Sequence, residues 1–342
     1  MAGLYDVDKK LPMPGYLKGV LNAVNEEAAF LYLLPHGQAV ANKLAEWPVQ
    51  LPVRRGDPTG QEGADKTDGF TKRTPQVLSC YAQRVQSEGW MITDLAGLTD
   101  TASGSGKTEA ARQQAMDAKA GLLAVQDMLL SNQDTATSAS ADDGMDRTRG
   151  VFSWLDSTAQ SVLPVPAGCR PTTAMNYTST QTQFTEDAFV TMLQAAGEQV
   201  DRDVDLVGYV GSALAQHMAD WDFKVAVTAA SEATTRQVVS KQDDKRIIRK
   251  VQFFDYHGST VKTIMQRRML CDLTVPGAAS KTAYTTRSGV FLDMKMWQLD
   301  WLDAWKHVPL LDQGGGPRGF HKGWVRLVCK NPMGQLRAYI AS

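Results

Sequence analysis

The feature that most constrains the fold of this 342-residue chain is a long amphipathic segment near its middle, residues 109–131. Its apolar residues recur at alternating spacings of four and three, which predicts one stripe along an α-helix. The stripe comprises Ala111, Ala115, Ala118, Leu122, Val125 and Leu129. Such a helix is about 35 Å long, and Ser105 or Thr108 can cap its beginning. We therefore predict a long strut whose stripe faces a core, with small alanines that let a sheet or helix approach closely.

Two short motifs follow this helix in order. Residues 149–156 read Arg-Gly-Val-Phe-Ser-Trp-Leu-Asp, and residues 184–193 read Phe-Thr-Glu-Asp-Ala-Phe-Val-Thr-Met-Leu. The stretch between them is polar and has no core signal. Thr185 is a suitable N-cap, and Phe184 and Phe189 flank it as a hydrophobic staple. The second motif therefore predicts the start of another helix.

From residue 184 onward, helices and strands alternate. The hydrophobic period predicts strands at 204–210, 247–256, 260–268, 289–293, 322–330 and 335–340, and helices at 213–222 and 294–305. Trp297, Trp301 and Trp305 stand four apart, which aligns them on one face of the last helix. Such a stripe indicates packing or a subunit interface more often than a platform for a ligand or nucleic acid.

The N-terminal third contains an unusual polar stretch. Strand-like runs at 47–53 and 76–92 enclose residues 54–75, in which Phe70 is the only large apolar residue. A structureless loop of about 20 residues is uncommon inside a compact domain. An isolated two-stranded hairpin, in turn, is barely stable in water. Two interpretations remain open: a surface loop, or a long hairpin that folds against a neighbouring subunit.

Bulk properties narrow the class of protein. The length predicts two lobes rather than one. The net charge is -1 and the charges are interspersed, so nothing directs the whole chain to DNA or to an anionic membrane. No apolar run approaches the roughly 18 residues of a membrane span, and we expect no membrane partner. The cysteines are far apart and predict reduced thiols rather than a disulfide framework: Cys80, Cys169, Cys271 and Cys329.

The sequence lacks the common motifs of catalysis and metal binding. Its five histidines are scattered without metal-ligand spacing, and it has no Gly-x-Ser-x-Gly elbow. Residues 104–108, Gly-Ser-Gly-Lys-Thr, look like the end of a phosphate-binding P-loop, but Thr101 occupies the position of the required earlier glycine. A basic cluster at residues 241–250 is diluted by two aspartates and indicates a solvated surface. We expect no catalytic residue, cofactor or metal.

The order of these segments resembles the major capsid proteins of tailed bacteriophages with the Hong Kong 97-type fold, in the subfamily typified by phage SU-ten. In that family a long helix forms the spine of the peripheral domain, a Gly-Val-Leu-Ser-Trp-Leu turn leaves it, and a helix beginning with Phe-Thr-Glu opens the axial domain. Residues 149–156 and 184–193 occupy the corresponding places here. Residues 290–297 also resemble a Leu-Asp-Pro segment of the family, although its proline is absent.

The resemblance implies an α+β fold in five parts. These are an N-terminal arm (1–40) with one helix at 16–34, an extended β-hairpin loop (41–93), a peripheral domain (94–183) with spine helix 108–131, an axial domain (184–305), and C-terminal strands (306–342) that return to the core. It also implies where neighbouring subunits touch. The expected intersubunit contacts are Trp47, Arg54, Arg55, Lys66, Phe70, Lys72, Arg73, Trp301 and Trp305.

The implied function is that of a major capsid protein. Its copies would form pentamers and hexamers that enclose double-stranded DNA in an icosahedral head, assembled in the host cytoplasm. Because the chain begins at Met1 without a fused scaffolding segment, we expect a separate scaffolding protein, together with a portal protein and decoration or minor capsid proteins. DNA contacts are expected to be nonspecific. Two other classes remain open: an encapsulin-like compartment that holds a cargo enzyme, and a P-loop NTPase.

Overall fold

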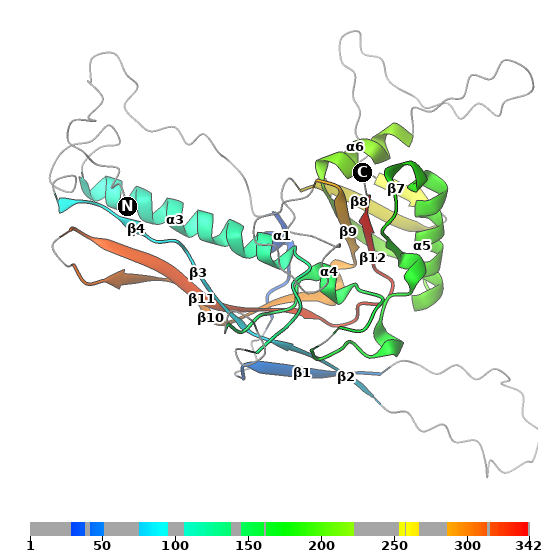
Figure 1. Ribbon diagram of the computed structural model, residues 1–342, viewed down its shortest axis with the longest axis horizontal. Coiled ribbons are helices and arrows are strands. Elements are labelled where there is room, and N and C mark those ends of the chain that lie inside the picture. The colour runs from blue at the N-terminus through cyan, green and yellow to red at the C-terminus, as the bar shows by residue number, and fades with distance from the viewer. Residues whose placement is uncertain are drawn as a thin grey trace, which may run out of the picture.

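The computed structural model describes residues 29–37, 42–50, 75–94, 106–137, 145–160, 162–221, 253–256, 258–266, 286–312 and 315–340. Within these ranges the chain forms a four-stranded sheet, a six-stranded sheet and a two-stranded sheet, with two hydrophobic cores. Figure 1 shows the long helix α3 with the four-stranded sheet on one side, and the six-stranded sheet with its helices on the other. This mixture of helix and sheet confirms the predicted α+β class.

The long helix predicted from the sequence is α3 (Gly106–Leu129). Its 24 residues correspond to about 36 Å at 1.5 Å per residue. The C-terminal half of the predicted stripe faces the core, since Val125 and Leu129 are buried. The strut and the orientation of its second half are therefore confirmed.

The N-terminal half of that stripe was predicted wrongly. Ala111 and Ala115 are exposed, whereas Asp117 and Gly121 contact the sheet. Asp117 accepts a hydrogen bond from a buried histidine of the sheet, and a Cβ added to Gly121 would lie 2.4 Å from Cζ2 of Trp305. The helix docks there through a carboxylate and a glycine, and a search for apolar periodicity registers neither of them.

A four-stranded sheet packs against α3. Its strands are β3 (Gln83–Gln86), β4 (Trp90–Met91), β10 (Trp297–Leu310) and β11 (Arg318–Cys329). The long strand β11 is central: it pairs antiparallel with β10 on one side, and with β3 and β4 on the other. The sheet is therefore held together by strands from the two ends of the chain.

The helix predicted at residues 294–305 is wrong. Met294–Met296 form a single 3-10 turn, and the residues after it are strand β10. Side chains four apart share a face in a strand as well as in a helix, because strand side chains alternate with period two. The spacing of the three tryptophans therefore fits both structures, and pairing with the distant strand β11 decides between them.

The second sheet has six strands in the order β5, β12, β9, β6, β8, β7. Their bounds are Asn176–Tyr177, Leu336–Tyr339, Ser288–Leu292, Asp205–Val210, Ser259–Met265 and Phe253–Tyr256. Strand β6 runs parallel to β8 and antiparallel to β9. Two helices, α5 (Glu186–Val200) and α6 (Ser212–Trp221), share a hydrophobic core with this sheet and lie beside it in Figure 1.

The start of α5 has the predicted cap. The Thr185 side chain accepts a hydrogen bond from the backbone N–H of Ala188 over 3.3 Å. The rings of Phe184 and Phe189 pack edge to face across it with centroids 6.2 Å apart. Both side chains are fully buried, so the hydrophobic staple also anchors the helix in the second core.

A two-stranded antiparallel ribbon joins β1 (Leu44–Val49) to β2 (Gln76–Tyr81). It confirms paired strands on both sides of the polar stretch, whose residues 54–74 lie outside the described ranges. Of the helix predicted at 16–34, the described part is the short α1 (Ala29–Leu33). The long strand predicted at 76–92 is divided into β2, β3 and β4.

The segment between the two motifs is irregular but contributes to the core. It begins after α4 (Val151–Trp154) and contains three 3-10 turns, Ala167–Cys169, Thr173–Met175 and Gln181–Gln183. Val165, Cys169 and Met175 are buried, so the expectation of no core signal was wrong. These residues are too widely spaced to form a periodic pattern, and tertiary contacts alone bring them inside.

The residues that form each of the two larger sheets do not follow the expected domain boundaries. From Trp297 onward, the end of the expected 184–305 domain pairs with β11 in the four-stranded sheet. The expected C-terminal segment, 306–342, contributes β11 to that sheet and β12 to the six-stranded sheet. The five-part division itself stays a prediction.

Candidate functional site

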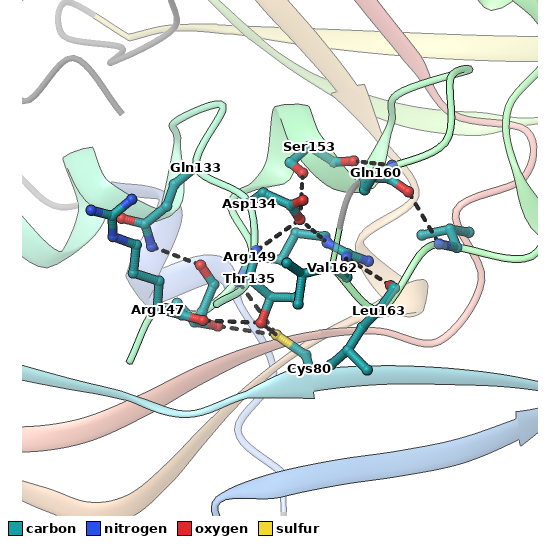
Figure 2. A network of polar contacts seen from close by, with 12 residues as sticks. Cys80, Gln133, Asp134, Thr135, Arg147, Arg149, Ser153, Gln160, Val162 and Leu163 are labelled. Carbon is teal, nitrogen blue, oxygen red and sulfur yellow. Dashed lines mark hydrogen bonds and ion pairs between the residues drawn. The ribbon is translucent and has the colours of Figure 1, made fainter. Parts of the chain in front are cut away.

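A buried polar network lies where α3 ends and the three sheets approach one another (Figure 2). After α3 the chain passes back along itself, because Ala136 and Arg147 exchange two backbone hydrogen bonds of 3.1 and 2.9 Å. This pairing brings residues 131–137 beside residues 145–149. We call the resulting set the Arg149 junction; it comprises Cys80, Gln83, Gln133, Asp134, Thr135, Thr148, Arg149, Ser153 and Gln160.

Arg149 is the centre of the junction, and its side chain is fully buried. Its Nε donates to Oδ1 of Asp134 over 3.0 Å, and one terminal nitrogen donates to the carbonyls of Val162 and Leu163, each over 2.8 Å. The guanidinium also lies 4.7 Å from the centre of the Trp154 ring, which provides a cation–π contact. One arginine therefore ties the end of α3, the α4 motif and the segment after α4 to a single point.

The strands are joined to the junction by small side chains. Thr148 accepts a hydrogen bond from the backbone N–H of Leu327 in β11 over 3.1 Å. The hydroxyl of Thr135 accepts from the backbone N–H of Tyr81 in β2 over 3.1 Å. The thiol sulfur of Cys80 accepts from the backbone N–H of Arg149 over 3.3 Å. The base of the β1–β2 ribbon is thus fixed to the four-stranded sheet.

A second buried arginine connects the six-stranded sheet to the same region. Arg337 of β12 donates to the carbonyl of Phe152 over 2.9 Å and to Oδ1 of Asp156 over 3.0 Å. Both acceptors belong to the Arg-Gly-Val-Phe-Ser-Trp-Leu-Asp motif singled out in the sequence. That motif therefore lies between the two larger sheets: it contains one buried cation, Arg149, and contacts a second, Arg337.

The polar groups of the junction have a structural role. Arginine stays charged at every accessible pH, and its planar fork binds several acceptors in fixed directions. Removing one partner of a buried ion pair leaves an uncompensated charge, which typically costs about 3–5 kcal/mol. The junction therefore fixes the relative positions of the sheets rather than presenting a reactive group.

Three of the expected intersubunit residues lie in the described part of the chain. Trp47 packs on Trp154 with ring centroids 5.8 Å apart, and its Nε1 donates to the carbonyl of Cys329 over 3.2 Å. Trp301 and Trp305 are partly buried against the core beneath α3, with ring centroids 6.4 Å apart. All three thus have packing partners within their own chain, and their contact with a neighbouring subunit stays a prediction.

The other expected contacts lie outside the described residues. These are Arg54, Arg55, Lys66, Phe70, Lys72 and Arg73. The structure therefore does not bring them together with the three tryptophans.

Sequence reasoning missed the members of the junction as functional residues. Arg149 immediately precedes an apolar run that is fully buried, and a charge at the edge of such a run was the available signal. Its partner Asp134 lies in a polar loop and carries no pattern of its own. Another buried pair, Arg326 of β11 with Asp300 of β10 at 3.2 Å, was also missed.

The described cysteines are free and buried thiols, as expected from their spacing: Cys80, Cys169 and Cys329. Burial raises the pKa of the Cys329 thiol far above its ordinary value, and raises the pKa of Cys169 as well. In the described part of the chain, no group of three or more His, Cys, Asp or Glu side chains is placed to hold a metal ion. No described helix is both long enough and apolar enough to cross a membrane.

The fold is shared with solved phage capsid structures. A structure of Mycobacterium phage Bobi aligns with a TM-score of 0.57 at 9% sequence identity, over 97% of this chain and 96% of that one. The capsid asymmetric unit of cyanophage A-1(L) gives 0.56 at 12% identity, over 96% of both chains. The capsid of a native GTA particle gives 0.56 at 11% identity, over 97% and 96%. At such low identity these likenesses show the Hong Kong 97-type fold.

The sequence itself points to one family. No curated protein matches it significantly. The family described as "SU10 major capsid protein" matches residues 7–336, nearly the whole chain. The chain therefore belongs to the SU10 major capsid protein family and is a shell protein of a phage head.

Proposed function

We propose that copies of this chain form pentamers and hexamers that close into an icosahedral shell around double-stranded DNA. The family match over residues 7–336 carries this proposal. The rigid junction around Arg149 supports it, because a shell subunit has to hold its sheets at fixed angles while its edges meet neighbours. Contacts that repeat head to tail close into rings, which is how one chain builds pentamers and hexamers. Its role in the head is structural and not enzymatic.

We further propose that the extended loop of one copy rests on the four-stranded sheet of a neighbour. Only one face of that sheet is covered by α3. Since side chains alternate along a strand and His321 faces α3, the side chains at even positions of β11 face away from it. That face carries four cations, Arg84, Lys306, Arg318 and Lys322. Lys306 and Lys322 pair directly across β10 and β11, and Lys306 also forms an ion pair with Asp303.

The loop sequence complements this surface. Between Arg55 and Lys72 it contains Asp57, Glu62, Asp65 and Asp68, against the single cation Lys66. Opposite charges on two surfaces guide their association and fix the register of docking. The basic ends of the loop, Arg54, Arg55, Lys72 and Arg73, together with Phe70, are the expected contacts on either side of this acidic centre.

A charge-swap experiment tests this contact. Reversing the sheet (Arg84→Glu with Lys322→Glu) or the loop (Asp65→Lys with Asp68→Lys) is expected to reduce the yield of shells, and combining the four changes is expected to restore it. Lys330→Glu serves as a control, because that residue is exposed beyond the end of β11. If the sheet reversal and the loop reversal each reduce the yield and the combined variant regains no shells, the proposed pairing is wrong.

We also propose a separate scaffolding protein, a portal protein and nonspecific contact with packaged DNA, in keeping with the family. Expression of the chain with and without candidate scaffolding proteins tests the first partner, since the chain alone is expected to form aberrant shells. DNA contact is expected to weaken steeply with salt, because phosphate contacts release counterions.

An encapsulin-like compartment is the second candidate, because it has the same fold. The family match favours the phage head. The contents of purified shells, DNA or a cargo enzyme, separate the two functions directly. The P-loop NTPase is disfavoured by the described strand before α3, since β4 runs antiparallel to its partner β11. The Lys107→Ala variant is expected to form shells as the wild type does.

A further inference from the structure

A row of five aromatic side chains lies on the sheet face that α3 covers. Neighbouring ring centroids along the row are 5.7, 5.2, 5.9 and 6.4 Å apart. We call it the ring ladder; in order it consists of Trp90, His307, His321, Trp305 and Trp301. Two of its inner members are histidines, whose charge changes near neutral pH. The N-terminal half of α3 rests on a surface that can therefore change its charge.

Asp117 of α3 fastens the helix to this ladder. Its carboxylate accepts hydrogen bonds from Nδ1 of His321 over 2.7 Å, from the hydroxyl of Ser87 over 2.5 Å and from the backbone N–H of Gly89 over 3.0 Å. The side chains of Asp117 and His321 are each 7% exposed. One carboxylate thus holds both β11 and the turn between β3 and β4 against the helix.

The other end of the ladder depends on an uncharged histidine. The indole N–H of Trp90 donates to Nε2 of His307 over 3.3 Å. An indole nitrogen can only donate a hydrogen bond, so Nε2 of His307 has to present its lone pair. A proton on that nitrogen would place a donor against a donor. This contact therefore exists only in the neutral form of His307.

A proton on His307 would also lie close to a second imidazole ring, that of His321. The rings of His307 and His321 lie 5.2 Å apart. The carboxylate of Asp117 from α3 contacts His321, and Glu88, in the turn between β3 and β4, is exposed. Lys306 and Lys322 are next to His307 and His321 in the sequence, and neighbouring residues of a strand point to opposite faces of the sheet. The two lysines therefore pair with each other on the face away from the histidines. A positive charge on His307 would therefore lie beside the His321 ring.

We propose that the ring ladder is an acid-sensitive latch between α3 and the four-stranded sheet. With His307 neutral, Trp90 is held by its hydrogen bond and β4 stays against the helix. Protonation of His307 removes the acceptor, adds a positive charge beside the His321 ring and releases β4 and the first half of α3. The hydrogen bond from Trp90 is present while His307 is neutral and is lost when acid protonates that ring. The latch is a property of the folded chain and does not depend on the proposed shell.

Amide hydrogen exchange of the full-length protein tests the latch. All variants are compared in the same assembly state, checked by electron microscopy, at about pH 7.5 and about pH 5.5, on either side of the histidine range. After correction for the intrinsic pH dependence, exchange in α3 and β4 of the wild type is expected to be about tenfold faster at the lower pH, as for the loss of one buried hydrogen bond. Exchange in α5, remote from the ladder, is expected to stay unchanged.

Three variants separate the latch from a general effect of acid. In His307→Gln the amide oxygen can accept from Trp90 without titrating, so exchange should stay slow at both pH values. In His307→Phe the acceptor is missing, so exchange should be fast at both. The exposed His36 is the control, and His36→Gln should respond to acid as the wild type does. A wild type without an acid response, or an acid response that persists in His307→Gln, overturns the proposal.

Discussion

Arg149 and Asp134 form an ion pair over 3.0 Å, although the arginine side chain is fully buried. The pair joins the motif that begins α4 to the loop that follows α3. A buried charge is tolerated because the same guanidinium also reaches two carbonyls and a tryptophan ring. The pair therefore holds together segments that have no strand or helix in common.

Breaking this pair should strongly destabilise the fold. Arg149→Met is expected to lower the free energy of unfolding by about 3–5 kcal/mol, because Asp134 and two carbonyls lose their donor. Urea unfolding followed by tryptophan fluorescence measures the change. Arg202→Met is the matched control: its ion pair with Asp293 is over half exposed on the arginine side, and its loss should cost less than about 1 kcal/mol. Equal effects of the two substitutions would contradict the account of the junction.

The close approach of α3 to the sheet gives a second prediction. Alanine normally stabilises a helix by about 1 kcal/mol relative to glycine. At Gly121 the added methyl group would lie 2.4 Å from Cζ2 of Trp305, so Gly121→Ala should instead destabilise the protein by about 1–3 kcal/mol. In α5 the nearest atom to an added Cβ at Gly197 is 3.4 Å away, so Gly197→Ala should be neutral or stabilising. Thermal unfolding of both variants decides, and a stabilised Gly121→Ala would show that the helix does not touch the sheet there.

The buried thiol of Cys329 predicts a loss of stability in alkali. Burial raises its pKa above the ordinary value of 9.0, so the folded chain keeps the proton that the unfolded chain releases. Stability from this group is complete below about pH 9 and falls as the pH rises further, because the unfolded state then binds fewer protons. Urea unfolding at several pH values should show this decline, and Cys329→Ala should reduce its slope. An identical slope in the variant would assign the decline to other groups.

Local signals in the sequence predicted the elements that local physics controls. Thr185 caps α5 because its hydroxyl reaches a free backbone N–H one turn away, and both partners are near in sequence. The strand β6 and the helix α6 also follow from their own periodicity. The resemblance rested on the order of such elements, which explains why it found the family.

The remainder depends on contacts between distant residues. Trp301 was assigned to a helix because a spacing of four fits helix and strand alike, and only β11 selects the strand. The partner of Arg149 lies in a polar loop, and Asp117 lies on α3 outside the apolar stripe that the sequence predicts. Polar groups that fold inward carry no periodic signal, so neither the junction nor the contact between Asp117 and the ladder could be predicted.

Electron microscopy of the purified full-length protein, expressed with the proposed scaffolding protein, tests the central claim most directly. The account predicts closed shells of uniform size, built from five- and six-membered rings of this chain. A protein that stays a compact monomer at high concentration, with residues 54–75 packed on its own body, would contradict it.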